Sequence, residues 1–538
     1  MRIKFLIFFI LTAFDLNVKS QYTTGIHYPD STKMVITDTT DLSVKYAKLV
    51  TADLLRKHLT YLASDELEGR ETGTKGNNLA SNYLKKEMMD MGLRAPQKTA
   101  SYFQDVKFTF SKWLDTDIFV NEKRFKHLWD YLSFPEMNQS RPVLNTDEVL
   151  YLGYGIDDEK YSDYNKVKEK ELQGKVIMIN KGEPMNKDSI YWISGTRQAS
   201  EWSQDINKKL EVAFQKGVAL VLIIEEDIKT LLNDNRRKLI GAQVSMEDTT
   251  SDTVTIANSC FISSTVAREI IGKKEKDVIK AREKINEKGK NKRVNLKTDL
   301  VVNQFKEVDV ISSKNVIGFI PGDEKPDEYI VVSAHYDHLG KKGDDIYNGA
   351  DDNGSGTSSV LTLANAFSQA DKDRVHFKRN IVFLLVTGEE KGLLGSEFYT
   401  HHPIIPLENT VADVNIDMVG RVDDKYQHNP NYIYVIGSDR ISQKLHDMNE
   451  ADNQKYSQLV LDYTYNDEAD PNRYYYRSDH YNFAKNGIPS VFFFNGTHAD
   501  YHRPTDTVDK INFEKMEKVD RHIFHLIWSL AMMDGNLK

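Results

Sequence analysis

The sequence predicts an α/β protein with a mostly parallel central sheet, helices on both faces of that sheet and a β-rich inserted domain. From residue 315 to the C terminus, continuous apolar runs alternate with helix-like segments, a pattern typical of parallel strands covered on both faces. Two helix-like segments lie near the N terminus. Between the two regions, short strand-like runs are separated by charged loops, which indicates a separate domain.

Residues 1–20 differ in character from the rest of the chain. Arg2 and Lys4 precede an apolar run over residues 5–14. That run is shorter than the roughly 20 apolar residues that span a bilayer, and a charged start before a short apolar run is typical of a secretory signal peptide. We therefore expect a signal peptide at 1–20, a secreted or periplasmic protein, and no association with a membrane.

Residues 21–134 are expected to form the N-terminal part of the main domain. Between residues 49 and 95, apolar side chains recur every three or four positions, which predicts two helices. The segment 64–76 separates them and contains Gly69, Gly73 and Gly76, which break both helices. This segment is either a solvated turn or a loop beside a functional site, and the sequence favours neither interpretation.

Residues 135–300 are expected to form the inserted domain. Strand-like runs occur at 148–154, 175–179 and 219–224, and the Lys- and Glu-rich stretch 273–297 is interpreted as a solvated helix face leading into a linker. The single cysteine, Cys260, excludes an internal disulfide and a cysteine zinc finger. We expect it to be a small buried side chain.

Residues 301–538 are expected to form the catalytic domain. The predicted strands are 316–320, 329–334, 381–387, 411–418, 432–436 and 490–494, and the predicted helices include 358–370 and 514–533. The whole chain has 80 acidic and 71 basic residues and a net charge of -9. This balance argues against a nucleic-acid-binding protein, which must neutralise phosphates.

Side chains suited to chemistry follow the ends of the predicted strands, where this architecture places its sites. These are His335 and Asp337, the pair Glu389 and Glu390, and Asp417. Two further segments, 349–356 and 501–507, are rich in Asp, Asn, Gly and His. Nitrogen and oxygen donors without thiolate suit zinc, manganese or cobalt.

The spacing of these residues suggests distinct roles. In an extended strand His335 and Asp337 point to one face, so Asp337 can accept a hydrogen bond from the imidazole while the other ring nitrogen binds a metal. Glu389 and Glu390 point to opposite sides if extended. One of them can then bind a metal while the other acts as a base.

Taken together, five motifs resemble the zinc-dependent exopeptidases of the bacterial leucyl aminopeptidase type, a family that also includes glutamate carboxypeptidase and glutaminyl cyclase. The resemblance covers residue 315 to the C terminus, and residues 59–92 are similar to the N-terminal segment of that family. Residues 174–179 and 214–224 resemble the protease-associated domain inserted in many of its members. The motifs are His335-x-Asp337, 349–356, 388–396, 415–418 and 501–507.

The resemblance implies two bound Zn²⁺ ions, with other divalent metals also possible. One ion is bound by His335 and Asp417, and the second by Glu390 and His502. Asp352 bridges both ions, with its neighbour Asp351 as the fallback ligand. Glu389 is the implied general base, and His480 is the main rival of His502.

The expected function is that of a secreted metal-dependent aminopeptidase, which hydrolyses N-terminal peptide bonds through a metal-bridging hydroxide. A carboxypeptidase or dipeptidase is an alternative, because Arg473, Arg477 and Arg503 could hold a free carboxylate. A glutaminyl cyclase and a non-catalytic binding relative are further alternatives. Substrate contacts are expected from Tyr475, Arg477 and Tyr501.

Three N-glycosylation sequons begin at Asn138, Asn353 and Asn495. Asn353 directly follows the implied bridging ligand, where a glycan would obstruct the site. We therefore expect either a bacterial source or an unused sequon.

Overall fold

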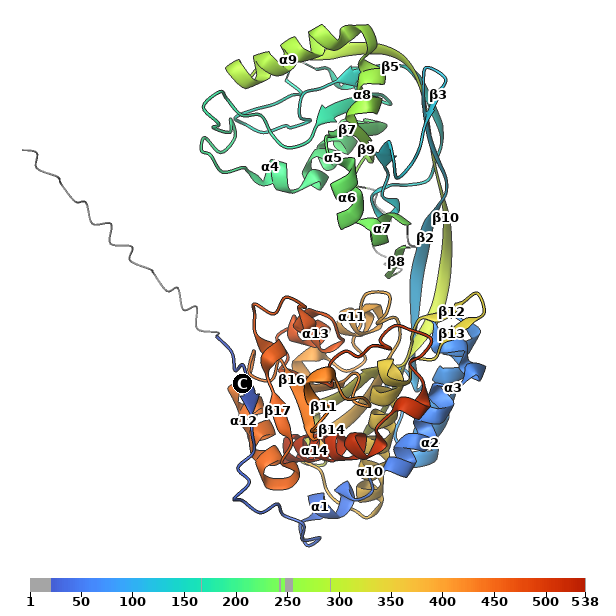
Figure 1. Cartoon of the computed structure of the whole chain (residues 1–538), viewed down its shortest axis with the longest axis vertical. Helices are drawn as coiled ribbons and strands as arrows, with labels where there is room; N and C mark the ends of the chain where they lie inside the picture. The colour runs from blue at the N-terminus through green and yellow to red at the C-terminus, as the bar shows by residue number, and fades with distance from the viewer. Residues whose placement is uncertain (1–20, 166, 241–242, 247–254, 291, 538) are drawn as a thin grey trace, which may run out of the picture. The chain divides into compact units, whose positions relative to one another are not determined.

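The computed structural model describes residues 21–165, 167–240, 243–246, 255–290 and 292–537, and the predicted signal peptide lies outside them. The chain forms two compact units (Figure 1). One unit combines the described residues up to Val106 with those from Ser312 onward, and the other spans Lys107–Ile311. The long strands β2 (Phe103–Val120) and β10 (Val294–Ile320) have residues in both units.

The first unit is built on a mixed sheet with a parallel centre. Its strand order is β1-β17-β16-β18-β15-β11-β14-β10. The neighbours β14, β11, β15 and β18 are parallel to one another, whereas β10, β16 and β1 each have an antiparallel neighbour. The strands are β1 (Ile26–His27), β11 (Lys325–His335), β14 (Arg379–Val386), β15 (Thr410–Ile416), β16 (Tyr432–Ile436), β17 (Val460–Asp462) and β18 (Ser490–Phe494).

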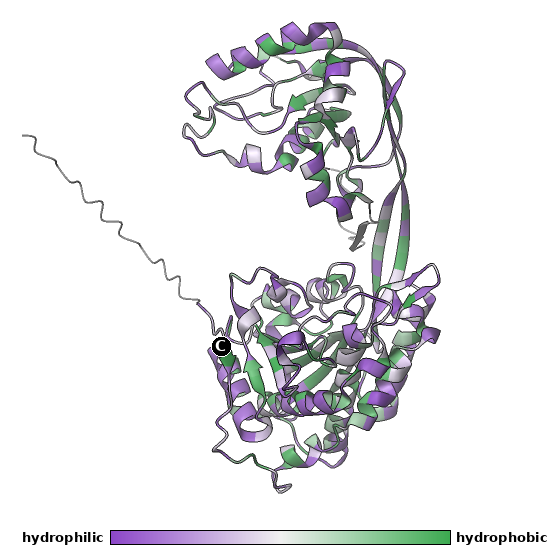
Figure 2. Cartoon of the chain, in the orientation of Figure 1, coloured by the Kyte–Doolittle hydropathy of each residue, from purple (hydrophilic) through white to green (hydrophobic). Residues whose placement is uncertain are grey.

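Helices cover both faces of this sheet, as the sequence predicts. Along β11, Ile330 and Val332 pack in one hydrophobic cluster with α2, α3, α10 and α14, whereas Val331 packs in another with residues of α11 and α13. Figure 2 shows hydrophobic residues concentrated on the strands and hydrophilic ones on the outer sides of the helices. Among these helices are α2 (Ala52–Leu62), α3 (Lys75–Met91), α10 (Gly356–Lys372), α11 (Leu394–His401), α13 (His480–Ala484) and α14 (Phe513–Met532).

The second unit contains both strands and helices. It contains the parallel strands β5 (Arg141–Tyr151), β6 (Val176–Asn180), β7 (Leu220–Glu225) and β9 (Asn258–Ser263). Helices accompany them, among them α5 (Ile206–Gln215), α8 (Ser264–Ile271) and α9 (Glu275–Lys288). Cys260 is buried in β9, as expected. The predicted linker after α9 is instead the start of β10.

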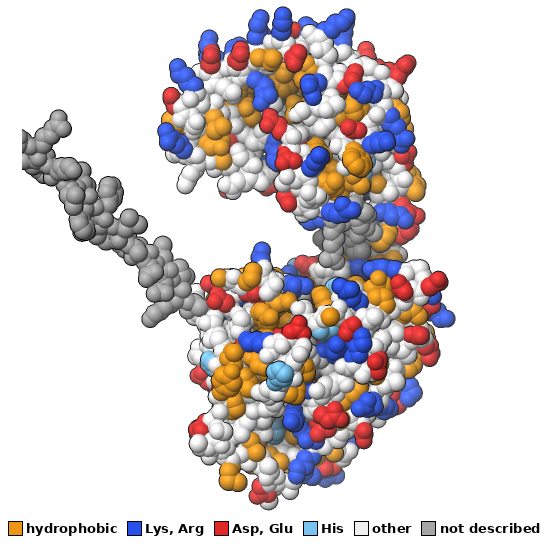
Figure 3. Space-filling model, viewed as in Figure 1, with side chains coloured by type: hydrophobic (Ala, Val, Ile, Leu, Met, Phe, Trp, Pro, Cys, Tyr) orange, Lys and Arg blue, Asp and Glu red, His pale blue; other side chains and the backbone are white. Residues whose placement is uncertain are grey.

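No helix in the described part of the chain is long and apolar enough to cross a membrane. On the face drawn in Figure 3, basic and acidic side chains are interspersed over the surface of each unit.

Candidate metal centre

The carboxyl ends of three neighbouring parallel strands carry most of the predicted site. His335 is the last residue of β11, Asp417 directly follows β15, and Glu389 and Glu390 follow the end of β14. Because β11 lies between β14 and β15, these side chains reach the same edge of the sheet, as expected for an open α/β sheet.

Asp352 lies in the irregular turn before α10, and its two carboxylate oxygens face different histidines. Oδ1 is 3.5 Å from His335 Nε2, and Oδ2 is 3.0 Å from His502 Nε2. The structure thus brings the strand-end residues together with two segments that are distant in the sequence.

The remaining pairs have the spacing of ligands that share one metal ion. His335 Nε2 lies 3.4 Å from Asp417 Oδ1, and His502 Nε2 lies 3.4 Å from Glu390 Oε2. Two tetrahedral zinc ligands, each about 2.1 Å from the ion, are about 3.4 Å apart. The donor set and its spacing therefore fit zinc.

His338 is a member of the cluster that the sequence analysis missed. Its Nδ1 donates to Glu390 Oε1 at 2.7 Å and lies 3.9 Å from Asp352 Oδ2. Potential donor atoms of His338, Asp352 and Glu390 all lie within 4.8 Å of one another, as do those of His335, Glu389 and Asp417. The signal for His338 was its place directly after the motif His335-x-Asp337.

The electrostatics of the cluster favour a bound cation. Burial raises the pKa of the Glu389 carboxyl well above its usual value. Burial alone would raise the pKa of Glu390 too, but hydrogen bonds from His338 and His502 hold it well below its usual range. Burial alone would lower the pKa of His502, but Asp352 and Glu390 raise it to about 10. The field that retains a proton on His502 also attracts a metal ion.

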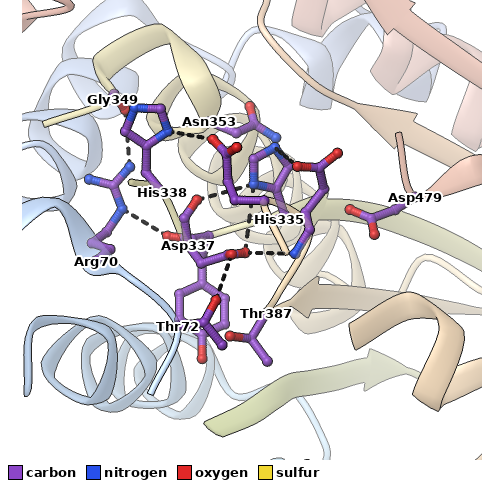
Figure 4. A network of polar contacts seen from close by, with 12 residues as sticks. Arg70, Thr72, His335, Asp337, His338, Gly349, Asn353, Thr387 and Asp479 are labelled. Carbon is purple, nitrogen blue, oxygen red and sulfur yellow. Dashed lines mark hydrogen bonds and ion pairs between the residues drawn. The ribbon is translucent and has the colours of Figure 1, made fainter. Parts of the chain in front are cut away.

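Asp337 does not form the predicted carboxylate–imidazole hydrogen bond. His335 Nδ1 is 3.1 Å from the main-chain oxygen of Asp337 and 3.8 Å from its Oδ1. The carboxylate accepts instead from Thr72 Oγ1 at 2.8 Å and from the main-chain N–H of Glu389 at 3.2 Å (Figure 4). The difference arises because β11 ends at His335, so the two-residue repeat of an extended strand does not continue to Asp337.

Asp351, the fallback ligand, is bonded elsewhere. Its carboxylate accepts from the main-chain N–H of Gly420 at 2.7 Å and from Asn495 Nδ2 at 3.1 Å, and lies 3.2 Å from His498 Nε2. The structure therefore brings Asp352, and not Asp351, to the two histidines.

His480, the rival of His502, is fully buried among aromatic side chains. Its ring stacks on Phe492 at a centroid distance of 4.9 Å. Burial lowers its pKa to about 3, so the ring is neutral at ordinary pH. His502 faces the carboxylates, with a backbone φ of +57° that is uncommon for a residue with a side chain. Such strained conformations concentrate at functional sites.

A pocket adjoins the cluster, with walls that only partly match the prediction. Tyr501 and Arg477 line it, and Arg477 Nη2 is 3.2 Å from Tyr501 Oη. Tyr475 is not among the residues that line the pocket, and the guanidinium carbon of Arg440 lies 3.7 Å from the centroid of its ring. Its neighbour Tyr474 lines the pocket. The other lining residues are Asp352, Glu389, Asp417, Met418, Phe492, Phe494, Thr497 and His502.

The three sequon asparagines are buried in the fold. Asn353 and Asn495 are 0% exposed and Asn138 is 1% exposed. Asn353 donates to the main-chain oxygen of Ile416 at 3.0 Å and accepts from the N–H of Gly356 at 2.9 Å. Its amide supports the turn that carries Asp352 and is not accessible to a glycan in the folded protein.

Residues 315–527 match the model of peptidase family M28. The chain is 29% identical over 215 residues to Aminopeptidase YwaD of Bacillus subtilis, covering 38% of this chain and 42% of that protein. It is also 29% identical over 224 residues to a probable leucine aminopeptidase of Trichophyton verrucosum, covering 40% and 57%. The matched part thus spans about half the length of these relatives.

Among solved structures, an aminopeptidase from Aneurinibacillus sp. strain AM-1 has a similar fold. The TM-score is 0.51 at 20% sequence identity, and the match covers 92% of this chain and 97% of that one.

Proposed function

Since residues 315–527 match the model of peptidase family M28, we propose that this protein is an exported zinc-dependent aminopeptidase. The observation that carries the proposal is the position of Asp352 between two histidines. In the proposed site His335 and Asp417 would hold one Zn²⁺ ion, Glu390 and His502 would hold a second, and Asp352, which faces both histidines, would contribute to both. Other divalent metals can take the same donors.

The chemistry requires a base beside the attacking water. Bound zinc lowers the pKa of water and polarises a carbonyl group. The carboxylate of Glu389 accepts a proton from the water as it attacks the peptide carbonyl, and then donates that proton to the leaving amine. Glu389 lines the pocket, and its Oε2 lies 3.9 Å from His335 Nε2, so it is placed to face a substrate.

The pocket indicates the class of substrate. Tyr474, Phe492, Phe494 and Met418 offer apolar surface next to the cluster, which suits an apolar side chain on the first residue of a peptide. Of the two relatives named above, one is called an aminopeptidase and the other a probable leucine aminopeptidase. We therefore assign peptides with leucine-like N-terminal residues as substrates.

The test compares free and blocked N termini. Purified protein is assayed on a small library of dipeptides and on their N-acetylated forms, with and without added zinc. Hydrolysis of the free-amine peptides, increased by zinc, supports the proposal. A preference for the blocked peptides would contradict it.

A carboxypeptidase or dipeptidase remains the second candidate because of Arg477. Of the three arginines considered from the sequence, Arg477 lines the pocket, whereas Arg473 lies over the ring of Tyr476 at 4.8 Å. A guanidinium beside the cluster could hold a substrate carboxylate. For this candidate, Arg477→Met would raise KM for peptides with a free C terminus and leave KM for C-terminally amidated peptides unchanged.

The remaining parts of the chain complete the proposal. Residues 1–20 are a signal peptide that directs the protein to the periplasm or the exterior, and the inserted unit is related to protease-associated domains. N-terminal sequencing of the exported protein tests the first point, since a mature chain that still contains residues 1–20 would contradict it.

A further inference from the structure

The loop 64–76, which the sequence left between two interpretations, lies beside the candidate metal centre. Its anchor is Arg70, whose side chain is 1% exposed. The guanidinium donates to the main-chain oxygen of Gly349 at 3.0 Å (Figure 4). It also donates to those of Tyr336 at 2.8 Å, of Asn348 at 2.7 Å and of Leu62. Arg70 thus ties the loop to the segments that carry His335 and Asp352.

The loop passes too close to its neighbours to be a solvated turn. Gly69 has φ +69°, and a Cβ atom there would collide with the carbonyl oxygens of Tyr347 and Gly340. Glycine alone meets both the conformation and the close approach. Thr72, three residues further along the loop, is also buried, with 4% of its surface exposed.

Thr72 contacts the centre through Asp337. Thr72 Oγ1 donates to Asp337 Oδ2 at 2.8 Å, and the other oxygen, Oδ1, accepts the main-chain N–H of Glu389 at 3.2 Å. Asp337 is 0% exposed, so water cannot replace a lost donor at low cost. The hydroxyl of Thr72 therefore fixes the carboxylate that in turn fixes the backbone of Glu389.

We propose that Thr72 is a positioning residue of the catalytic centre, acting through Asp337 on Glu389. The segment that supplies it lies outside residues 315–527, the part matched by the family model. The expected effect of Thr72 on kcat rests on the proposed peptidase function. Its expected effect on the positions of Asp337 and Glu389 does not.

The experiment compares three variants of the full chain. Thr72→Val removes the hydroxyl at nearly constant volume, and Thr72→Ser retains it. Thr74→Val is the matched control, because Thr74 Oγ1 donates to the main-chain oxygen of Glu71 and caps α3, away from Asp337. For each protein we measure kcat and KM for a leucyl dipeptide, zinc content and melting temperature.

The proposal expects Thr72→Val to lower kcat by about 10- to 100-fold, with KM and zinc content near the wild-type values. Thr72→Ser restores kcat, and Thr74→Val lowers the melting temperature without changing kcat. Wild-type kcat in Thr72→Val overturns the proposal, as does a Thr72→Ser variant that is as slow as Thr72→Val. A loss of kcat in Thr74→Val equal to that in Thr72→Val does so too.

If the wild-type protein hydrolyses no peptide, the proposed function fails and crystal structures decide the inference. Zinc-loaded wild type and Thr72→Val are then compared. Displacement of the Asp337 carboxylate and of the Glu389 backbone in the variant supports the positioning role. Unchanged positions of both groups overturn it.

Discussion

Asp506 Oδ2 accepts the main-chain N–H of Asp352 at 3.2 Å, and the same oxygen accepts that of Asp351 at 3.0 Å. Asp506 is four residues after His502 in the sequence. One loop therefore supplies a histidine of the cluster and also holds the turn that carries the central carboxylate. The position of Asp352 therefore depends on the same loop that carries His502.

The variant Asp506→Ala removes the acceptor of both N–H groups, and we expect it to weaken zinc binding by about 10- to 100-fold. Asp506→Asn retains one carbonyl oxygen and should keep most of the affinity. Competition with a chromophoric chelator measures both. Wild-type affinity in Asp506→Ala would show that the turn holds its shape without this contact.

Substitution of the proposed base separates metal binding from chemistry. Glu389→Gln keeps the shape of the side chain but cannot accept the proton of the attacking water, so kcat should fall by about 10²- to 10⁴-fold. Zinc content should stay at the wild-type level. An active Glu389→Gln enzyme would remove Glu389 from the role of base.

Two histidines that differ in surroundings test the ligand assignment. His502→Ala should lower zinc content, because His502 Nε2 faces Asp352 and Glu390. His480→Phe preserves the aromatic packing on Phe492 and should leave zinc content unchanged. Metal analysis of both purified variants makes the comparison, and loss of zinc in His480→Phe alone would reverse the assignment.

His338 should tune the affinity of the site for metal. Its Nδ1–H donates to Glu390 Oε1 at 2.7 Å, and groups that orient a metal ligand commonly contribute about 10- to 100-fold in affinity. We expect His338→Ala to lower zinc affinity by this factor. Full affinity in His338→Ala would mean that Glu390 is held by its other contacts.

The buried carboxyl of Asp520 in α14 predicts a dependence of stability on pH. Burial raises its pKa from 3.8 to about 8, although Ser359 donates a hydrogen bond to it. Between pH 3.8 and about pH 8 the unfolded state releases the proton of Asp520 while the folded state retains it. The free energy of unfolding therefore falls as pH rises through this range, and this group causes no further change above about pH 8.

Asp520→Asn removes this titration. The free energy of unfolding of the variant, relative to wild type, should therefore increase between pH 5 and pH 8 by more than about 1 kcal/mol. Urea denaturation at both pH values, with saturating zinc, provides the measurement. If the free energies of unfolding of the variant and the wild type differ by the same amount at both pH values, the raised pKa of Asp520 is contradicted.

The strand ends could be predicted from sequence because continuous apolar runs locate parallel strands, and their carboxyl ends locate the site. His335, Glu389, Glu390 and Asp417 all lie where this rule places them. The cluster also includes Asp352 and His502, which the family resemblance supplied and which no periodicity indicates.

Other features depend on contacts that have no local signal. The partner of Asp337 is Thr72, which lies far away in the sequence, and the end of β11 alters the direction of the Asp337 side chain. Tyr474 and Tyr475 are neighbours in a run of tyrosines, so only packing against Arg440 decides which of them turns from the pocket. In the inserted unit the Lys- and Glu-rich stretch 273–297 predicts a helix, and α9 lies within it, whereas α5 and α8 were not predicted.

We propose that residues from separate stretches of the chain bind zinc in one cluster around Asp352. Anomalous diffraction at the zinc absorption edge, from crystals of the zinc-loaded protein, tests it most directly. We expect two zinc peaks, one in contact with His335 and Asp417 and one in contact with Glu390 and His502. Zinc-loaded crystals without an anomalous peak beside Asp352 would contradict it.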